Sequence, residues 1–174
     1  MALGSLCEAA ITLSDNTAMN LLLASLKGPD AVTAFARSLD DAATRLDRTE
    51  PALNEAVPGD PRDTTTPSAM ARDLTALVLG EALSAASRGR LAGWMVANTT
   101  GGTKLRAGLP PGWTVGDKTG AGGHGTSNDV AVAWTPDGRP LVVAVYLTGA
   151  VSATEEARSA AMAAVGRIAA ATLA

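Results

Sequence analysis

The chain has 174 residues, 47% of them hydrophobic, a length and composition that suit one domain with a core of its own. Its net charge is −3 and its lysines and arginines form no cluster, which argues against a nucleic-acid partner, because phosphate binding requires concentrated positive charge. Residues 141–151, the longest apolar stretch, are about half a membrane span, and residues 1–4 lack the charged start and apolar run of a signal peptide. One histidine and one cysteine argue against a metal site, so we expect no nucleic acid, no membrane, no metal and no cofactor.

The first hundred residues show the apolar periodicity of helices. Ser14-Asp15-Asn16 is expected to end one helix and cap the next, since all three residue types are favoured at helix N-caps. The predicted helices cover residues 6–13, 17–26, 29–39, 68–83 and 84–97.

The segment 46–67 interrupts this pattern and cannot be one helix, because it contains Pro51, Pro58 and Pro61 before it reaches Pro67. A loop of this length without regular structure is usually functional when it lies inside a compact domain. We therefore expect residues 46–67 to belong to a site.

Two interpretations of the polar residues in this loop remain open. Arg48 and Asp63 either form an ordinary surface ion pair, worth about 0–1 kcal/mol, or they clamp the base of an Ω-type loop. In the second interpretation the loop holds Glu50 and Asn54 over a pocket. The loop alone does not decide between them.

After residues 101–102 the pattern changes to that of strands, predicted at 113–121, 128–134 and 140–148. Pro136-Asp137-Gly138-Arg139 is a turn sequence that joins the last two strands, and Ser152 is expected to cap an alanine-rich helix that ends near residue 171.

The predicted fold class is α/β (α+β), with a helical lobe at 1–100 and an antiparallel sheet with a closing helix at 101–174. A sheet of three strands is small and leaves unpaired edges. We expect residues 1–174 to be a single, incomplete domain that lacks strands and a helix.

Three short motifs occur in a fixed order along the chain. They are Ser14-Asp15-Asn16, the pair Glu50 and Asn54 in the loop, and Lys118-Thr119-Gly120 on a predicted strand. Each motif alone has an ordinary structural explanation, because Ser, Asp and Asn cap helices and a strand lysine next to glycine is a weak signal.

Order and spacing together are far more specific. S-D-N and K-T-G occur with S-x-x-K in class A β-lactamases and penicillin-binding proteins. The chain resembles a class A serine β-lactamase over nearly its whole length, and its first two strands and its nucleophile helix would lie before residue 1. The matching stretches are 6–17, 46–51, 53–55, 62–67, 98–101, 105–110 and 115–120.

The resemblance implies catalytic roles for four residues. Ser14 would relay a proton to the leaving β-lactam nitrogen, while Lys118 would hold the substrate carboxylate beside it. Glu50, assisted by Asn54, would position and deprotonate the water that hydrolyses the acyl-enzyme.

It also implies a substrate-binding set. Asn16 would bind the acylamide side chain, Thr119 would bind the carboxylate and Arg106 would add positive charge nearby. The backbone of Gly120 and Ala121 would line the site, with the N–H of Ala121 as half of the oxyanion hole.

Three further residues would have structural roles by resemblance. Arg48 and Asp63 would hold the loop, and Cys7 matches a position that in many relatives forms a disulfide with a residue just after the nucleophile. Its partner would lie outside this sequence. Full-length members are secreted or periplasmic, although this chain carries no signal peptide.

The sequence departs from the family because it has no Ser-x-x-Lys. The residues three positions before Lys27, Lys104 and Lys118 are Ala24, Gly101 and Val115. We therefore expect that this chain alone does not turn over β-lactams. It is either a truncated product or one half of a split enzyme completed by a separate N-terminal segment.

Two other functions remain open. A penicillin-binding D,D-peptidase has the same fold, but a long-lived acyl-enzyme does not need the loop carboxylate of Glu50 and its partner Asn54. A non-catalytic β-lactam-binding fragment would retain the pocket wall and lose the chemistry. Binding without turnover would distinguish it.

Overall fold

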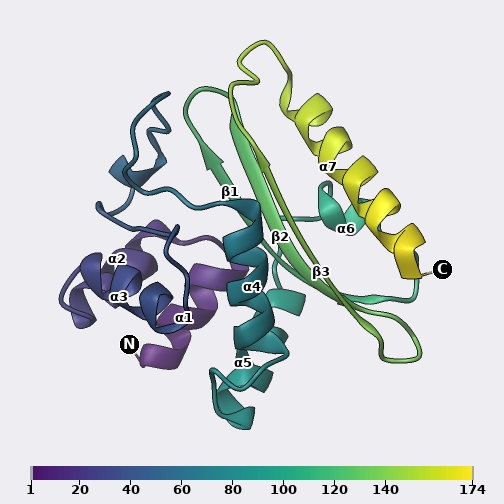
Figure 1. The fold of residues 1–174 in the computed structure, drawn as a ribbon, viewed down its shortest axis with the longest axis horizontal. Helices are drawn as coiled ribbons and strands as arrows, with labels where there is room; N and C mark the ends of the chain where they lie inside the picture. Colours follow the sequence, from purple (N-terminus) through teal and green to yellow (C-terminus); the bar gives the residue numbers. More distant parts are fainter. Residues whose placement is uncertain (1, 174) are drawn as a thin grey trace.

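The computed structural model describes residues 2–173, which form a group of helices packed beside a three-stranded antiparallel sheet (Figure 1). The helices are α1 (Leu3–Thr12), α2 (Asn16–Ser25), α3 (Asp30–Ser38), α4 (Pro67–Val78), α5 (Ala85–Val96), α6 (Leu105–Gly108) and α7 (Glu155–Ala170), with 3₁₀ turns at Ala52–Asn54 and Ala171–Leu173. The strands are β1 (Thr114–Gly122), β2 (Thr126–Trp134) and β3 (Pro140–Leu147). The predicted fold class is confirmed.

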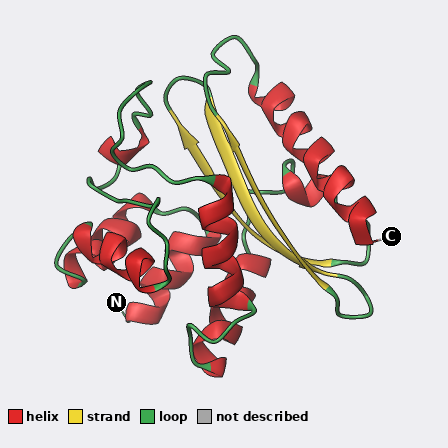
Figure 2. Ribbon diagram, viewed as in Figure 1, coloured by secondary structure: helices red, strands yellow, loops and turns green. Residues whose placement is uncertain are grey.

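The sheet has helices on both faces (Figure 2). Its strand order is β1-β2-β3, and successive residues of β2 face opposite sides. Val132 packs with Leu74 of α4 and Met95 of α5, whereas Ala131 and Ala133 pack with residues of α6 and α7. The sheet therefore separates two cores, and β1 borders both.

Some element boundaries differ from those that the sequence predicts. Helix α4 ends at Val78 and not at residue 83, because the N–H of Gly80 bonds back to the carbonyl of Thr75 at 2.8 Å and closes the helix. Helix α7 is capped by Thr154, whose hydroxyl accepts from Ala157 N, and not by Ser152. Helix α6, with four residues, is too short for periodicity to reveal.

None of the helices within residues 2–173 has both the length and the apolar character that crossing a membrane requires.

Candidate active site

Ser14 and Lys118 meet although they belong to different elements. Ser14 lies between α1 and α2 with a left-handed backbone, φ 56°, and Asp15 caps α2 by accepting from Ala18 N at 2.7 Å. The ammonium of Lys118, on β1, donates to the hydroxyl of Ser14 and to the carbonyl of Thr119 at 2.6 Å. Asn16, the first residue of α2, is exposed beside this contact. A hydroxyl bonded to an ammonium is a proton donor in waiting.

The electrostatics of Lys118 connect it to the loop. Burial lowers the pKa of Lys118, and the negative charges of Asp117, Asp129 and Glu50 oppose this by raising it. The net result is a pKa below the ordinary value for lysine. The carboxylate of Glu50 is therefore close enough to Lys118 to act on its charge.

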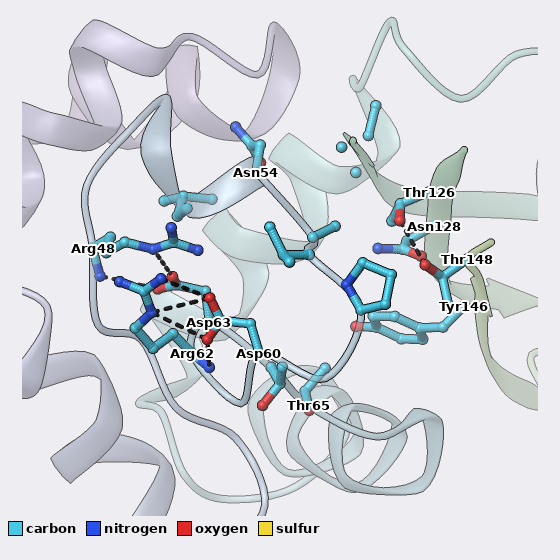
Figure 3. A pocket seen from close by; sticks show the side chains of 18 of the residues that line it. Arg48, Asn54, Asp60, Arg62, Asp63, Thr65, Thr126, Asn128, Tyr146 and Thr148 are labelled. Atoms are coloured by element: carbon cyan, nitrogen blue, oxygen red, sulfur yellow. Dashed lines mark hydrogen bonds and ion pairs between the residues drawn. The ribbon is translucent and has the colours of Figure 1, made fainter. Parts of the chain in front are cut away.

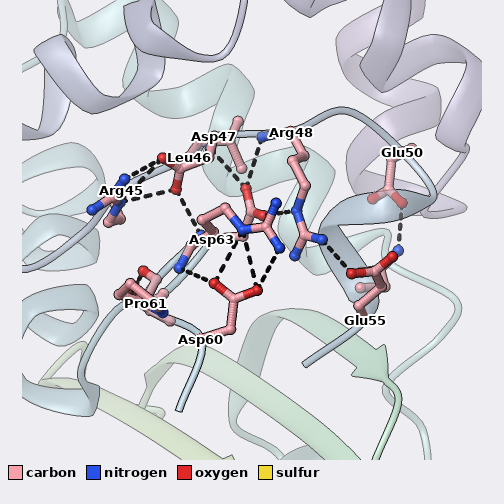
Figure 4. A network of polar contacts seen from close by, with 12 residues as sticks. Arg45, Leu46, Asp47, Arg48, Glu50, Glu55, Asp60, Pro61 and Asp63 are labelled. Carbon is pink, nitrogen blue, oxygen red and sulfur yellow. Dashed lines mark hydrogen bonds and ion pairs between the residues drawn. The ribbon is translucent and has the colours of Figure 1, made fainter. Parts of the chain in front are cut away.

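Glu50 is held at both its backbone and its side chain. The side-chain amide of Asn20 donates to the carbonyl of Glu50 and accepts from its N–H, each at 2.9 Å. Asn54 donates to the carboxylate of Glu50 (Figure 4). The Glu50–Pro51 peptide bond is cis. Sequence analysis missed Asn20; its position one helical turn after Asn16, on the same face of α2, is the signal that points to it.

The loop 46–67, which we call the Ω-loop, is closed by a compact network (Figure 4). The carboxylate of Asp63 accepts from the N–H groups of Asp47 and Arg48 at 2.7 and 3.0 Å, and from Arg48 Nε at 2.6 Å. The side chain of Asp63 is 2% exposed, so this contact is not an ordinary surface pair. Of the two interpretations of Arg48 and Asp63, the geometry favours the clamp.

A cavity of about 430 Å³ lies between the Ω-loop and the sheet. The Ω-loop contributes Asn54 to its wall, β1 contributes residues 120–122, and Asn128 and Tyr146 come from β2 and β3 (Figure 3). The end of β1 touches the loop directly, since Gly123 N donates to the carbonyl of Asn54 at 2.8 Å. Strand and loop are thus fixed to each other at the site.

The hydroxyl of Thr119 joins a hydrogen-bond chain that leads into the protein. It lies 2.6 Å from the hydroxyl of Thr100, which donates to Asn98 Oδ1 at 2.9 Å, and Asn98 Nδ2 donates to Asp117 at 2.7 Å. Asp117 is fully buried. The chain orients Thr119 relative to its neighbour Lys118.

The structure does not place Arg106 where we expected a substrate-binding charge. Its guanidinium pairs with Asp117, with Nε at 3.0 Å, and approaches the carbonyls of Met95 and Val96 at 3.4 Å. Alternate strand residues face opposite sides, so this pair lies on the sheet face away from the side chain of Lys118. The charge of Arg106 compensates a buried carboxylate.

Other cations occupy the same sheet face as Thr119, and sequence analysis missed them. Lys104 is buried and donates to the hydroxyl of Ser127 at 2.8 Å and to Glu155 at 2.6 Å, while Arg158 also pairs with Glu155 at 3.0 Å. Ser127 pairs with Ala121 in the sheet register. Two cations thus share one carboxylate at this end of β1.

Cys7 is half-buried on α1 with a free thiol. Within residues 2–173, no three His, Cys, Asp or Glu side chains gather in a way that could hold a metal ion.

Known proteins with this architecture are β-lactamases. Residues 1–173 match the model of the Beta-lactamase enzyme family. The chain is 60% identical over 148 residues to β-lactamases CTX-M-97 and Toho-1 of Escherichia coli, which covers 85% of this chain and 51% of each relative. It is 58% identical to β-lactamase OXY-2 of Klebsiella oxytoca over the same shares.

Solved structures agree. An ancestral (GNCA) class A β-lactamase superposes with a TM-score of 0.96 at 62% identity, covering 99% of this chain and 66% of that one. The last common ancestor of Gram-negative bacteria (GNCA4) class A enzyme gives 0.97 at 59% identity, covering 100% and 66%. The chain belongs to the class A β-lactamase family, and it spans about half the length of the curated relatives it matches.

Proposed function

We propose that these residues form the water-activating and substrate-holding parts of a site that hydrolyses β-lactam antibiotics through a serine acyl-enzyme. The observation that carries this proposal is that the Ser14–Lys118 contact and the Glu50–Asn54 contact share one electrostatic environment, in which the charge of Glu50 raises the pKa of Lys118. Proton donor and water activator serve successive steps of one reaction.

Ring opening requires a proton on the lactam nitrogen as the C–N bond breaks. Ser14 supplies it, because its hydroxyl accepts a hydrogen bond from the ammonium of Lys118 and its own proton is free to point at the substrate. Lys118 and Thr119 hold the substrate carboxylate, and Asn16 binds the acylamide. The N–H of Ala121 stabilises charge on the carbonyl oxygen; losing one such donor typically costs about 2.7–4 kcal/mol.

Hydrolysis of the ester then requires an activated water. Glu50 is suited to act as the general base, since Asn20 fixes its backbone and Asn54 fixes its carboxylate. A carboxylate held in this way has no use in a D,D-peptidase that keeps its acyl-enzyme, and this disfavours that alternative.

The attacking hydroxyl has no counterpart in the printed sequence, which contains no Ser-x-x-Lys. Removing the nucleophile of another serine hydrolase costs on the order of a millionfold in rate. We expect no turnover of a chromogenic cephalosporin by the purified chain. Turnover above background and proportional to protein would contradict this expectation.

A chimaera tests the site itself. The segment of CTX-M-97 that precedes the matched region, with its Ser-x-x-Lys, is joined upstream of this chain or added as a separate polypeptide. We expect hydrolysis when it is joined, and activity from the mixture would support a split enzyme. In the chimaera Glu50→Gln should be acylated once and then stall, whereas Glu81→Gln, at an exposed residue, should turn over normally.

The alternative is a fragment that binds β-lactams without chemistry. Calorimetric titration of the chain with a penicillin distinguishes the two, because saturable binding weakened by Lys118→Met would support the binder. We further propose that longer forms of this protein act in the periplasm or outside the cell, as the family does.

A further inference from the structure

Two buried aspartates meet at the base of the Ω-loop, away from the site described above. Asp41 follows α3 and is 1% exposed, and Asp73 lies on α4 and is 6% exposed. One precedes the Ω-loop and the other follows it. Buried carboxylates without a cation are rare, because burial strongly disfavours their charge.

The two carboxyl groups lack other partners on the sides that face each other. Asp41 Oδ1 accepts from the N–H groups of Ala43 and Thr44 at 2.7 and 3.1 Å. Asp41 Oδ2 and Asp73 Oδ1 have no donor among residues 2–173, and the two side chains are close enough to hydrogen-bond to each other. A carboxyl group donates only when it is protonated, so this contact requires one proton.

No ion pair within the described residues neutralises either carboxylate. Arg37 of α3 donates to the main-chain carbonyls of Asp41 and of Thr44, the latter at 2.8 Å, and not to a carboxylate. Arg72, next to Asp73 on α4, acts on it only through its charge, and Tyr146 of β3 faces it as a phenol whose pKa burial raises to about 12. A second negative charge would thus be uncompensated.

The pair is connected to both ends of the Ω-loop. The turn that Asp41 organises ends at Thr44, whose hydroxyl lies 2.6 Å from that of Thr65. Arg45 N donates to the carbonyl of Thr64 at 2.9 Å. Thr66 then caps α4, the helix that carries Asp73.

We propose that Asp41 and Asp73 form a single-proton site that fastens the base of the Ω-loop, and that loss of the proton loosens both ends of the loop. With one proton, Asp73 donates to Asp41 and the turn is tied to α4. Without it, two like charges face each other in a buried place and push these segments apart.

The titration of the two groups agrees with this geometry. Burial, then the hydrogen bond to Asp41 and its charge, raises the pKa of Asp73 to about 6. Burial opposes the charge of Asp41, but hydrogen bonds from Thr44, Ala43 and Asp73 outweigh it and lower its pKa to about 2. Because folded Asp73 keeps its proton above the unfolded pKa of 3.8, stability should fall as the pH rises from about 4 to about 6.

The test compares Asp73→Asn with Asp40→Asn in the full chain. An asparagine at 73 donates permanently to Asp41, while Asp40 is exposed and next to the pair. Between pH 4 and pH 7 the melting temperature of wild type and of Asp40→Asn should fall by more than that of Asp73→Asn. All three proteins retain Asp129, so its titration cancels in the comparison.

Two direct measurements keep the proposal testable if Asp73→Asn folds poorly. Carboxyl carbon NMR of the wild-type chain should show Asp73 titrating near pH 6. Amide exchange in residues 44–66, corrected for its intrinsic pH dependence, should become faster from pH 5 to pH 7 in the wild type. A midpoint for Asp73 near 4, or equal melting-temperature losses in all three proteins, would overturn the proposal. The result does not depend on β-lactam hydrolysis, because no substrate is involved.

Discussion

The ammonium of Lys118 donates to the hydroxyl of Ser14, a residue 104 positions earlier in the chain. This contact joins the edge strand of the sheet to the junction between α1 and α2, which are otherwise separate parts of the fold. It also orients the two groups that would deliver a proton. The predictions below concern the contacts that hold this arrangement together.

Asn20 fixes the backbone of Glu50, so removing its side-chain amide should free that peptide. In Asn20→Ala the amide of Glu50 loses its acceptor at 2.9 Å, and we expect its hydrogen exchange to accelerate with a loss of about 1–2 kcal/mol in local stability. Asn54→Ala is the control, because Asn54 contacts only the carboxylate and should leave the Glu50 amide protected. Equal protection in wild type and Asn20→Ala would contradict the clamp.

Asp63 closes the Ω-loop with three hydrogen bonds to Asp47 and Arg48. Asp63→Asn removes the charge from a buried acceptor, and we expect about 2 kcal/mol of destabilisation together with faster proteolysis within residues 46–66. Asp60→Asn alters an ion pair between near neighbours, Asp60 and Arg62, and should have a smaller effect. Urea unfolding compares the two, and a larger loss in Asp60→Asn would count against this description of the loop.

Gly123 marks the place where β1 touches the Ω-loop. A Cβ there would lie 2.4 Å from the carbonyl oxygen of Glu55, which is backbone and cannot move aside cheaply. We expect Gly123→Ala to displace the loop and to cost about 1–3 kcal/mol. Gly102→Ala, with open space around its Cβ, is the matched control. Identical unfolding curves for Gly123→Ala and wild type would show that the contact is looser than described.

Asp129 should make stability depend on pH. Burial, then the charge of Asp117, raises the pKa of Asp129 to about 7. The folded state therefore holds a proton that the unfolded state has released, and stability falls as the pH rises from about 4 to about 7, by on the order of 4 kcal/mol. Asp129→Asn should remove this fall in urea unfolding at pH 5 and pH 8, while the exposed Asp137→Asn should keep it. An unchanged fall in Asp129→Asn would contradict the assignment.

Much of the fold follows from local sequence. Apolar periodicity gave the long helices, and the turn at residues 136–139 gave the last two strands. Where the prediction missed, a short element or a distant partner was responsible. Which basic residue of 104–106 faces which carboxylate depends on the four-residue helix α6, so Arg106 was expected near the substrate while Lys104 was overlooked.

The site followed the same rule. The motifs supplied residues such as Glu50 and Lys118 because order and spacing are visible in one sequence. The supporting contacts were invisible: Asn20 holds Glu50 across 30 positions, and Asp41 meets Asp73 only after α4 packs against the turn. Partners of this kind are set by packing and not by spacing.

The most direct measurement is the pKa of the Lys118 side chain, followed by carbon NMR of its Cε in wild type, Glu50→Gln and Glu55→Gln. The negative charge of Glu50 raises this pKa, so Glu50→Gln should lower it. Glu55 pairs with Arg48, and Glu55→Gln should leave it unchanged. A Lys118 titration that is the same in wild type and Glu50→Gln would mean that strand and loop do not share one site.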